Sequence, residues 1–194
     1  AGALMSAYLG RRFELANLLS FDMGGTTSKG ALVRGGAPVK RYSMEVARVH
    51  ESRHGSGLTI RIPAIDMIEI GAGGGSIAEI DDRGLLRVGP GSAGADPGPA
   101  CYGRGGTKPT LTDANLMLGY LDAGFFLGGA MALDRSAAET AIRKGVAEPL
   151  GLETLRAAWG IHNVVCEDVA RAFRIHASEH GFDYRSGSMV AFGG

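Results

Sequence analysis

Clustered glycine is the feature that most constrains what this chain can fold into. The chain has 32 glycines in 194 residues, more than double the usual share of about 7%. They gather at 24–25, at 71–75 and between 84 and 106. Low-complexity sequence would spread them evenly, whereas clusters between apolar segments are typical of shaped loops on a rigid scaffold. We therefore expect a globular protein that uses its glycine turns.

Composition and charge exclude several classes of partner. Lys plus Arg and Asp plus Glu number 20 each, so the chain has no basic footprint for nucleic acid or an anionic membrane. Its apolar runs are far shorter than a bilayer span, and no signal peptide pattern opens the chain. Cys101 and Cys166 lie far apart without metal or disulfide spacing, so we expect free thiols and a cytoplasmic location.

The chain reads as mixed α and β, with strands first and helices later. The ends, "AGALMSAYLG" inside a helical pattern and "MVAFGG" after a strand, indicate an excised piece of a longer protein. We expect a strand-rich and glycine-loop-rich part over 17–110, and a helical part with a closing strand over 111–194.

Apolar alternation and turn residues define the predicted strands. Segments 17–22 and 28–34 flank Gly24-Gly25 as a hairpin, and 77–81 with 85–89 flank Asp82-Arg83-Gly84 as another. We also expect a third strand at 37–49, one bent strand or two at 58–70, and a strand at 188–192. Residues 89–109 contain so few bulky apolar side chains that no packed element is expected there.

Capping residues define the predicted helices. Thr112 and Asp134 are candidate N-caps, and Gly151 and Gly181 are candidate stops. The longest helix is expected at 153–180. Its predicted apolar face comprises Leu155, Trp159, Val165, Val169 and Phe173.

The first glycine turn, in "FDMGGTT", suits a phosphate with its metal ion. Glycines let backbone N–H groups approach an anion, the hydroxyls of Thr26, Thr27 and Ser28 add donors, and Asp22 can hold Mg²⁺ directly or through water. An ordinary Gly-Gly hairpin with a capping aspartate explains the same few residues equally well.

The longer strings carry a resemblance to a known family. "FDMGGTT" resembles the phosphate hairpin of sugar kinases, Hsp70 and actin. The strings "IPAIDMIEIGAGGGSIA", "GPGSAGADPGPACYGRGGTKPTLTDANLMLGYLD" and "FLGG" resemble the hydantoinase A and 5-oxoprolinase family, and the resemblance covers nearly all of 17–194.

This resemblance implies an α/β domain of the actin-like ATPase (ribonuclease H-like) class. It also implies ATP-dependent cleavage of a cyclic amide such as a hydantoin, N-methylhydantoin or 5-oxoproline, assisted by Mg²⁺ and often K⁺. The family has an upstream N-terminal domain that is absent here, and a hydantoinase B-type subunit is a possible partner. The piece alone is expected to be inactive or nearly so.

Roles follow for the glycine turns and their neighbours. We expect Asp22 to hold the metal and the turns to contact the nucleotide phosphates; these contacts are assigned to Gly24, Gly25, Thr26, Thr27, Gly73, Gly74, Gly193 and Gly194. Lys29 departs from family members that carry an acid there. Ser76 and Asp113 are expected substrate contacts, although Asp113 and Asn115 begin a helix and capping explains them too.

Two further aspartates are candidates for catalysis. Asp66 suits a general base or a second metal ligand, against the alternative that it only accepts backbone hydrogen bonds. Asp96, in "GADPGP", is a second candidate, although turn chemistry also explains it. Cys101 is expected to be a plain small residue rather than a nucleophile.

"HASEH", residues 176–180, matches the H-x-x-E-H zinc pattern. No glutamate follows it, so the usual third ligand would have to come from elsewhere. The preferred interpretation is that His176 and His180 end a helix as favourable cations.

Two alternative functions stay open. One is an ATP-dependent carboxylase subunit of the acetone carboxylase type, in which ATP activates a ketone or bicarbonate. The other is a nucleotide-binding module without small-molecule chemistry. A second glycine-rich loop system favours an enzyme, since a plain nucleotide sensor has no use for it.

Overall fold

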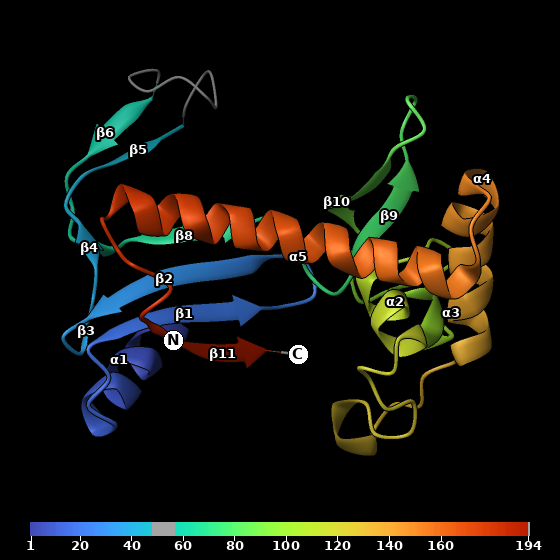
Figure 1. The fold of residues 1–194 in the computed structure, drawn as a ribbon, viewed down its shortest axis with the longest axis horizontal. Coiled ribbons are helices and arrows are strands. Elements are labelled where there is room, and N and C mark those ends of the chain that lie inside the picture. The colour runs from blue at the N-terminus through green and yellow to red at the C-terminus, as the bar shows by residue number, and fades with distance from the viewer. Residues whose placement is uncertain (48–56, 194) are drawn as a thin grey trace. The chain divides into compact units, whose positions relative to one another are not determined.

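The computed structural model describes residues 1–47 and 57–193 and confirms a mixed α and β fold (Figure 1). Its strands are β1 (Asn17–Met23), β2 (Ser28–Arg34), β3 (Ala37–Pro38), β4 (Lys40–Arg41), β5 (Met44–Val46), β6 (Leu58–Ile60), β7 (Ala64–Ile65), β8 (Met67–Ile70), β9 (Ser76–Ile80), β10 (Leu86–Ser92) and β11 (Ser188–Gly193). Its helices are α1 (Gly2–Arg12), α2 (Leu111–Met117), α3 (Arg135–Ile142), α4 (Glu148–Leu150) and α5 (Thr154–Glu179). Short 3₁₀ turns η1 (Ala100–Tyr102) and η2 (Leu127–Gly129) and the π-helical turn η3 (Arg143–Ala147) complete the set.

The chain divides into two compact units. Unit 1 comprises Ala1–Asp22, Lys29–Ile68 and His176–Phe192, and unit 2 comprises Met23–Ser28, Glu69–Ile175 and Gly193–Gly194. Within the described residues, no helix combines the length and the apolar character that crossing a membrane requires.

Unit 1 is built on a sheet. Its strand order is β11-β1-β2-β3, and β8 also pairs with β2; Figure 1 shows β11, β1 and β2 side by side. Helix α1 packs on this sheet through Ala7, which is buried with Leu18 and Val33. Gly10 allows the close approach, because a Cβ there would lie 2.8 Å from the Leu18 side chain.

The predicted third strand at 37–49 is wrong over its described part. Three short strands replace it, and each has a different partner: β3 pairs with β2, β4 with β7 and β5 with β6. Segment 58–70 likewise forms β6, β7 and β8 rather than one or two strands. The sequence does alternate between apolar and polar residues, but the strands end wherever the chain changes its pairing partner.

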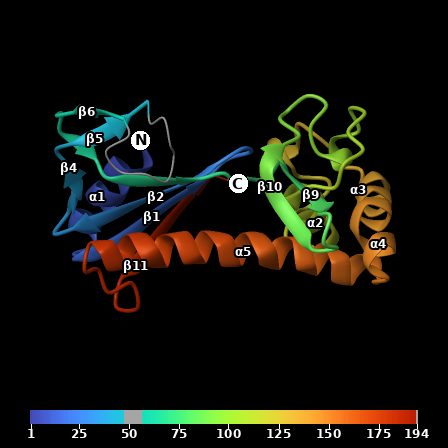
Figure 2. The same ribbon diagram turned by 90° about the horizontal axis from the view of Figure 1, so that it is seen from above.

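Unit 2 packs helices against the antiparallel hairpin β9–β10, which confirms the second predicted hairpin. Figure 2 shows α2 beside this hairpin, with α3 and α4 farther out. The core includes Leu116, Ile142, Val146 and Ile161, all fully buried.

The apolar face predicted for the long helix is wrong in its first two turns. Leu155 and Trp159 are 54% and 51% exposed, whereas Ala158, Ile161 and Val165 are buried. Small and aliphatic side chains, rather than the largest ones, line the packed face.

The predicted helix ends are mostly confirmed. Asp134 caps α3 by accepting the Ala137 N–H at 3.0 Å, and Gly151 and Gly181 adopt positive φ after α4 and α5. The Thr112 cap is wrong, because Thr110 is the N-cap of α2 in a capping box with Asp113.

Candidate functional site

Two glycine turns of unit 2 lie directly against each other. We call residues 24–28 the first turn and residues 71–76 the second turn. Gly74 N–H donates to the carbonyl oxygen of Gly24 at 3.0 Å, and Gly75 N–H donates to that of Gly25 at 2.6 Å. The structure thus brings together Gly24 and Gly25 with Gly73 and Gly74, which the sequence analysis assigned to one phosphate site from separate motifs.

Two buried serines reinforce this contact. The Ser28 hydroxyl donates to the carbonyl oxygen of Ala72 at 2.6 Å, and Ser76 Oγ accepts the Gly73 N–H at 2.9 Å. Both serines are fully buried. Ser76 therefore organises the second turn from inside, and the Ser28 hydroxyl, which was expected to be a donor to the phosphate, is buried and clamps the two turns together instead.

Gly73 is the point of closest approach between the turns. A Cβ built on Gly73 would lie 2.7 Å from the carbonyl oxygen of Gly24 and from the carbonyl carbons of Gly25 and Thr26. Real Cβ atoms do not approach backbone that closely, so only glycine permits this packing.

The first turn presents its tip to solvent. Gly24, Gly25 and Thr26 are exposed and Thr27 is half-buried. The turn is closed by the Gly24 N–H, which donates to the carbonyl oxygen of Thr27 at 3.0 Å. Bare backbone and two threonine hydroxyls therefore lie on a rigid, outward-facing turn, which suits an anionic ligand.

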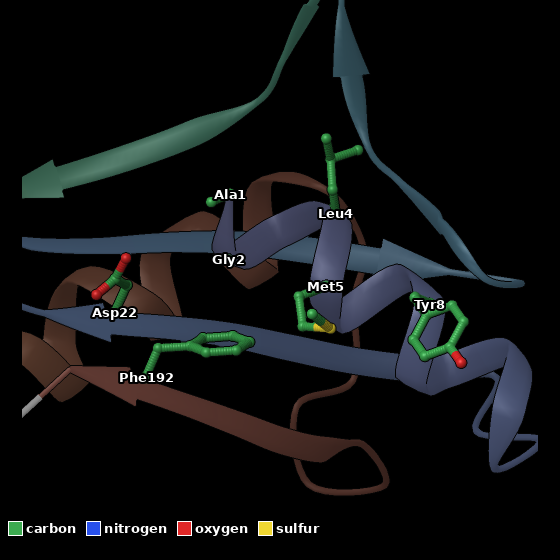
Figure 3. A pocket seen from close by; sticks show the side chains of 7 residues that line it. All are labelled: Ala1, Gly2, Leu4, Met5, Tyr8, Asp22 and Phe192. Carbon is green, nitrogen blue, oxygen red and sulfur yellow. The ribbon is translucent and has the colours of Figure 1, made fainter.

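Asp22 is the penultimate residue of β1 and lines a pocket of about 630 Å³ in unit 1. Figure 3 shows the Asp22 carboxylate near Gly2 and Phe192, with the side chains of α1 along the rest of the pocket. The walls are otherwise largely apolar, from Leu4, Met5 and Tyr8. The sequence analysis missed this pocket, because it gave helix α1 no part in the site.

Asp113 is fully buried and holds the loop before α2. Its carboxylate accepts hydrogen bonds from Cys101 N–H at 2.8 Å, Thr110 N–H at 2.9 Å, Thr110 Oγ1 at 2.8 Å and Ala100 N–H at 3.3 Å. This is the geometry of a structural carboxylate and favours the capping interpretation over substrate contact.

The same bonds explain a wrong expectation about residues 89–109. That loop was expected to hold no packed element, yet Pro99 and Cys101 are fully buried and η1 forms there. Hydrogen bonds to a buried charge order the loop in place of apolar packing. Burial and the nearby Asp113 charge raise the pKa of the Cys101 thiol, so Cys101 is no activated nucleophile.

Helix α2 connects this carboxylate to the glycine turns. Thr112 N–H and Thr112 Oγ1 both donate to the carbonyl oxygen of Gly74 at 2.8 Å. Within unit 2, the second turn is therefore held on one side by α2 and on the other by the first turn.

The remaining predicted residues lie elsewhere. Asp96 is exposed on its loop. Gly193 lies so close to Met23 that a side chain would overlap the Met23 carbonyl, and Gly194 falls outside the described residues. Asp66 is buried in unit 1, where it pairs with Arg41 and His180.

The histidines of "HASEH" do not both act as helix-ending cations. His176 is 3% exposed, and desolvation lowers its pKa, although the nearby Asp66 charge acts in the opposite direction. Burial disfavours the charged form of this imidazole, which goes against the preferred interpretation of His176 as a helix-ending cation.

A second polar cluster on α5 was missed. His162 Nδ1 lies 2.9 Å from Asn115 Oδ1, and Cys166 Sγ lies 3.3 Å from His162 Nε2. Tyr120 stacks on the His162 ring with 4.9 Å between centroids. Burial raises the pKa of Cys166, so this arrangement leaves the thiol protonated near neutral pH. The helical spacing of His162 and Cys166 was the available signal.

Comparison with known proteins matches the whole chain to one family. A family model described as hydantoinase/oxoprolinase covers residues 1–194. Caprolactamase subunit alpha of Pseudomonas jessenii is 46% identical over 184 residues, which are 94% of this chain and 25% of that protein. The 5-oxoprolinase of Saccharomyces cerevisiae is 36% identical over 190 residues, covering 91% of this chain and 14% of that protein.

Solved structures agree with the sequence matches. The ATP-dependent caprolactamase of Pseudomonas jessenii superposes with a TM-score of 0.83 at 42% identity, covering 100% of this chain and 27% of that chain. A nucleotide-free acetone carboxylase superposes with a TM-score of 0.84 at 30% identity, covering 99% and 26%. The chain thus spans about a quarter of the length of both solved chains.

Proposed function

The chain belongs to the hydantoinase/oxoprolinase family, and we propose that it supplies a phosphate-binding turn to an ATP-dependent enzyme that opens a cyclic amide. The observation that carries the proposal is the clamped first turn, which is fixed from behind by Gly74 and Gly75 and exposed at Gly24 and Gly25. Support comes from relatives described as 5-oxoprolinase and ATP-dependent caprolactamase.

In this proposal the first turn contacts the phosphates of ATP. The backbone N–H of Gly25 and the hydroxyls of Thr26 and Thr27 would donate to phosphate oxygens, while the N–H of Gly24 closes the turn on the Thr27 carbonyl oxygen. Gly73 and Gly74 act from behind by fixing the turn. Asp22 offers the hard oxygen donor that Mg²⁺ prefers, and the bound ion would neutralise phosphate charge.

The chemistry follows from the weakness of an amide as an electrophile. Transfer of the γ-phosphoryl group from ATP to the ring carbonyl oxygen would release ADP and make the carbonyl carbon open to attack by water, which a general base must deprotonate. The C–N bond of the ring would then break with a proton going to the nitrogen, and inorganic phosphate would leave to give the carboxylate. Asp96 is the exposed carboxylate that we propose for the base. Of the two catalytic roles that the sequence leaves open for Asp66, base and metal ligand, the second is developed below.

The substrate class is a hydantoin, N-methylhydantoin, 5-oxoproline or a similar lactam. We propose an N-terminal domain of the same protein and a hydantoinase B-type subunit as its partners, in keeping with a relative named as one subunit of its enzyme. We propose the cytoplasm as its location, since both cysteines are free.

One observation favours a second candidate function. The acetone carboxylase superposes as well as the caprolactamase does, so the same clamped turn would serve ATP-dependent carboxylation. In that case a ketone with bicarbonate, rather than a cyclic amide, would stimulate ATP consumption by the longer protein.

Calorimetric titration of Mg-ATP into this chain tests the phosphate turn. We expect weak binding that disappears in Asp22→Ala and persists in Glu139→Ala, which removes an exposed carboxylate from α3. Equal binding by wild type and Asp22→Ala would contradict the role of Asp22. If neither binds, the titration is repeated on the longer protein, where the same loss on Asp22→Ala is required.

A further inference from the structure

A cluster of three potential metal ligands lies in unit 1 and shares no residue with the two glycine turns. Asp66, His176 and His180 each offer one ligand atom, and these atoms all lie within 4.8 Å of one another. Two atoms that bind one tetrahedral Zn²⁺ at about 2.0–2.1 Å lie about 3.4 Å apart. Small side-chain rotations would therefore bring the three atoms onto one ion.

The helix and the strands place these residues for different reasons. His176 is in the last turn of α5 and His180 follows the helix by one residue, so the i, i+4 spacing puts both rings on one side. Their centroids are 4.8 Å apart. Asp66 sits between β7 and β8, and its Oδ2 lies 2.9 Å from His180 Nε2. This aspartate is the third ligand that the sequence of "HASEH" lacked.

His176 gives the independent sign of a missing ligand. Its ring is 3% exposed, and its Nε2 has no hydrogen-bond partner. In the described part of the chain, Ser6 Oγ is the only other buried side-chain polar atom in that condition. A buried imidazole nitrogen without a partner costs free energy, and a metal ion would satisfy it.

Arg41 fixes the carboxylate without occupying it fully. Arg41 donates through Nε to Asp66 Oδ1 at 2.7 Å and through a second N–H to the same oxygen. The other oxygen, Oδ2, points to His180. Outer-shell partners orient metal-binding carboxylates in this way. Oδ1 stays hydrogen-bonded to Arg41, and Oδ2 is left to bind a metal ion.

We propose that Asp66, His176 and His180 form a binding site for a divalent transition metal ion of the Zn²⁺ class. Two imidazoles and one carboxylate are the ligands that Zn²⁺ accepts while keeping a fourth position for water or another ligand. The ion would reach the site past His180, whose side chain is 26% exposed. It would tie the segment before β8 to the end of α5.

Metal titration of the untagged, chelator-treated chain tests the site. We expect one equivalent of Co²⁺ to bind with the visible absorption of a tetrahedral complex, and Zn²⁺ to displace it. Because Zn²⁺ would bind the folded state, it should also raise the melting temperature. Neither readout depends on enzymatic activity.

Three variants make the test specific. Loss of an outer-shell partner alone costs about 10- to 100-fold in metal affinity, so His180→Ala and Asp66→Asn, which remove ligands, should cost at least about 100-fold. His162→Ala is the control. It removes a half-buried histidine of the same helix that is hydrogen-bonded to Asn115 and is not one of the three ligands, so this variant should bind the metal like wild type. Circular dichroism checks that each variant is folded, and His180, the most exposed of the three ligands, is the safest to replace.

The opposite result is equally clear. No binding by the wild-type chain, or binding that folded His180→Ala retains, would overturn the proposal and leave the cluster as a metal-free ion-pair network. The three metal ligands include neither Asp22 nor any residue of the glycine turns, so failure of the nucleotide titration would not bear on the metal.

Discussion

Gly75 donates its backbone N–H to the carbonyl oxygen of Gly25 across 2.6 Å, and so ties together two turns that lie far apart in the sequence. The neighbouring bond from Gly74 to Gly24 repeats the contact. Both donors belong to the second turn and both acceptors to the first. The shape of the first turn, which we propose as the phosphate site, is thus set by the second.

Replacing Gly73 by alanine should damage this contact. The added Cβ would lie 2.7 Å from backbone atoms of Gly24, Gly25 and Thr26, and backbone cannot rotate away as a side chain can. Overpacking of this kind costs about 1–3 kcal/mol, which lowers the melting temperature by roughly 2–4 °C per kcal/mol in a chain of this size. Thermal unfolding measures the loss.

Gly91→Ala is the matched control. Gly91 has no positive φ, and a Cβ there would meet no atom within 4 Å, so its melting temperature should stay close to that of wild type. Equal stability of Gly73→Ala and Gly91→Ala would show that the two turns are not packed as described.

Asp113→Ala should be more damaging than the loss of an ordinary helix cap. It leaves four buried donors without their acceptor, from Ala100, Cys101 and Thr110. We expect a loss of at least about 2–3 kcal/mol in the free energy of unfolding, measured in urea. Asp134→Ala, which removes the exposed cap of α3, should cost only about 1 kcal/mol. A smaller loss for Asp113→Ala than for Asp134→Ala would contradict the structural role.

Much of the fold could be predicted because its signals are local. Apolar alternation and turn residues predicted the two hairpins. Gly151 and Gly181 predicted the ends of α4 and α5, and both glycines have positive φ in the structure. The prediction of one strand at 37–49 failed because a change of pairing partner does not alter the alternation of apolar and polar residues along the sequence. The face of α5 failed because Leu155 and Trp159 suggested burial by size alone, while Ala158 and Ile161 do the packing.

The sequence allowed the glycines of the candidate site to be predicted, but not the contacts that hold them together. The motifs marked both turns, yet nothing in the sequence states that Ser28 bonds Ala72 or that Thr112 bonds Gly74. The metal cluster shows the same limit. "HASEH" was visible as two ligands, and the third, Asp66, lies more than a hundred residues earlier and becomes a neighbour only through the fold.

The two thiols should differ in accessibility to a water-soluble disulfide reagent. Cys166 is exposed and Cys101 is fully buried, so the native protein should release one equivalent of chromophore and the denatured protein two. Cys166→Ser should abolish the native reaction. Rapid labelling of both thiols in the native state would show that the loop around Cys101 opens readily.

Cys101 should also make the protein less stable at alkaline pH. Burial raises its pKa in the folded protein above the ordinary thiol value of 9.0. Above that value the unfolded chain loses the thiol proton while the folded chain keeps it. The unfolded state then binds fewer protons, so the free energy of unfolding falls as pH rises.

The stability that the protonated thiol contributes is therefore complete below about pH 9 and is lost with increasing pH, by up to about 1.4 kcal/mol per pH unit. Lysines and tyrosines titrate in the same range, so the wild type must be compared with Cys101→Ala. The alanine variant is less stable at pH 7 because it leaves a cavity, but the gap between the two proteins should narrow from pH 9 to 10.5. A gap that stays constant over this range in urea unfolding would mean that the Cys101 thiol ionises as freely in the folded protein as in the unfolded chain.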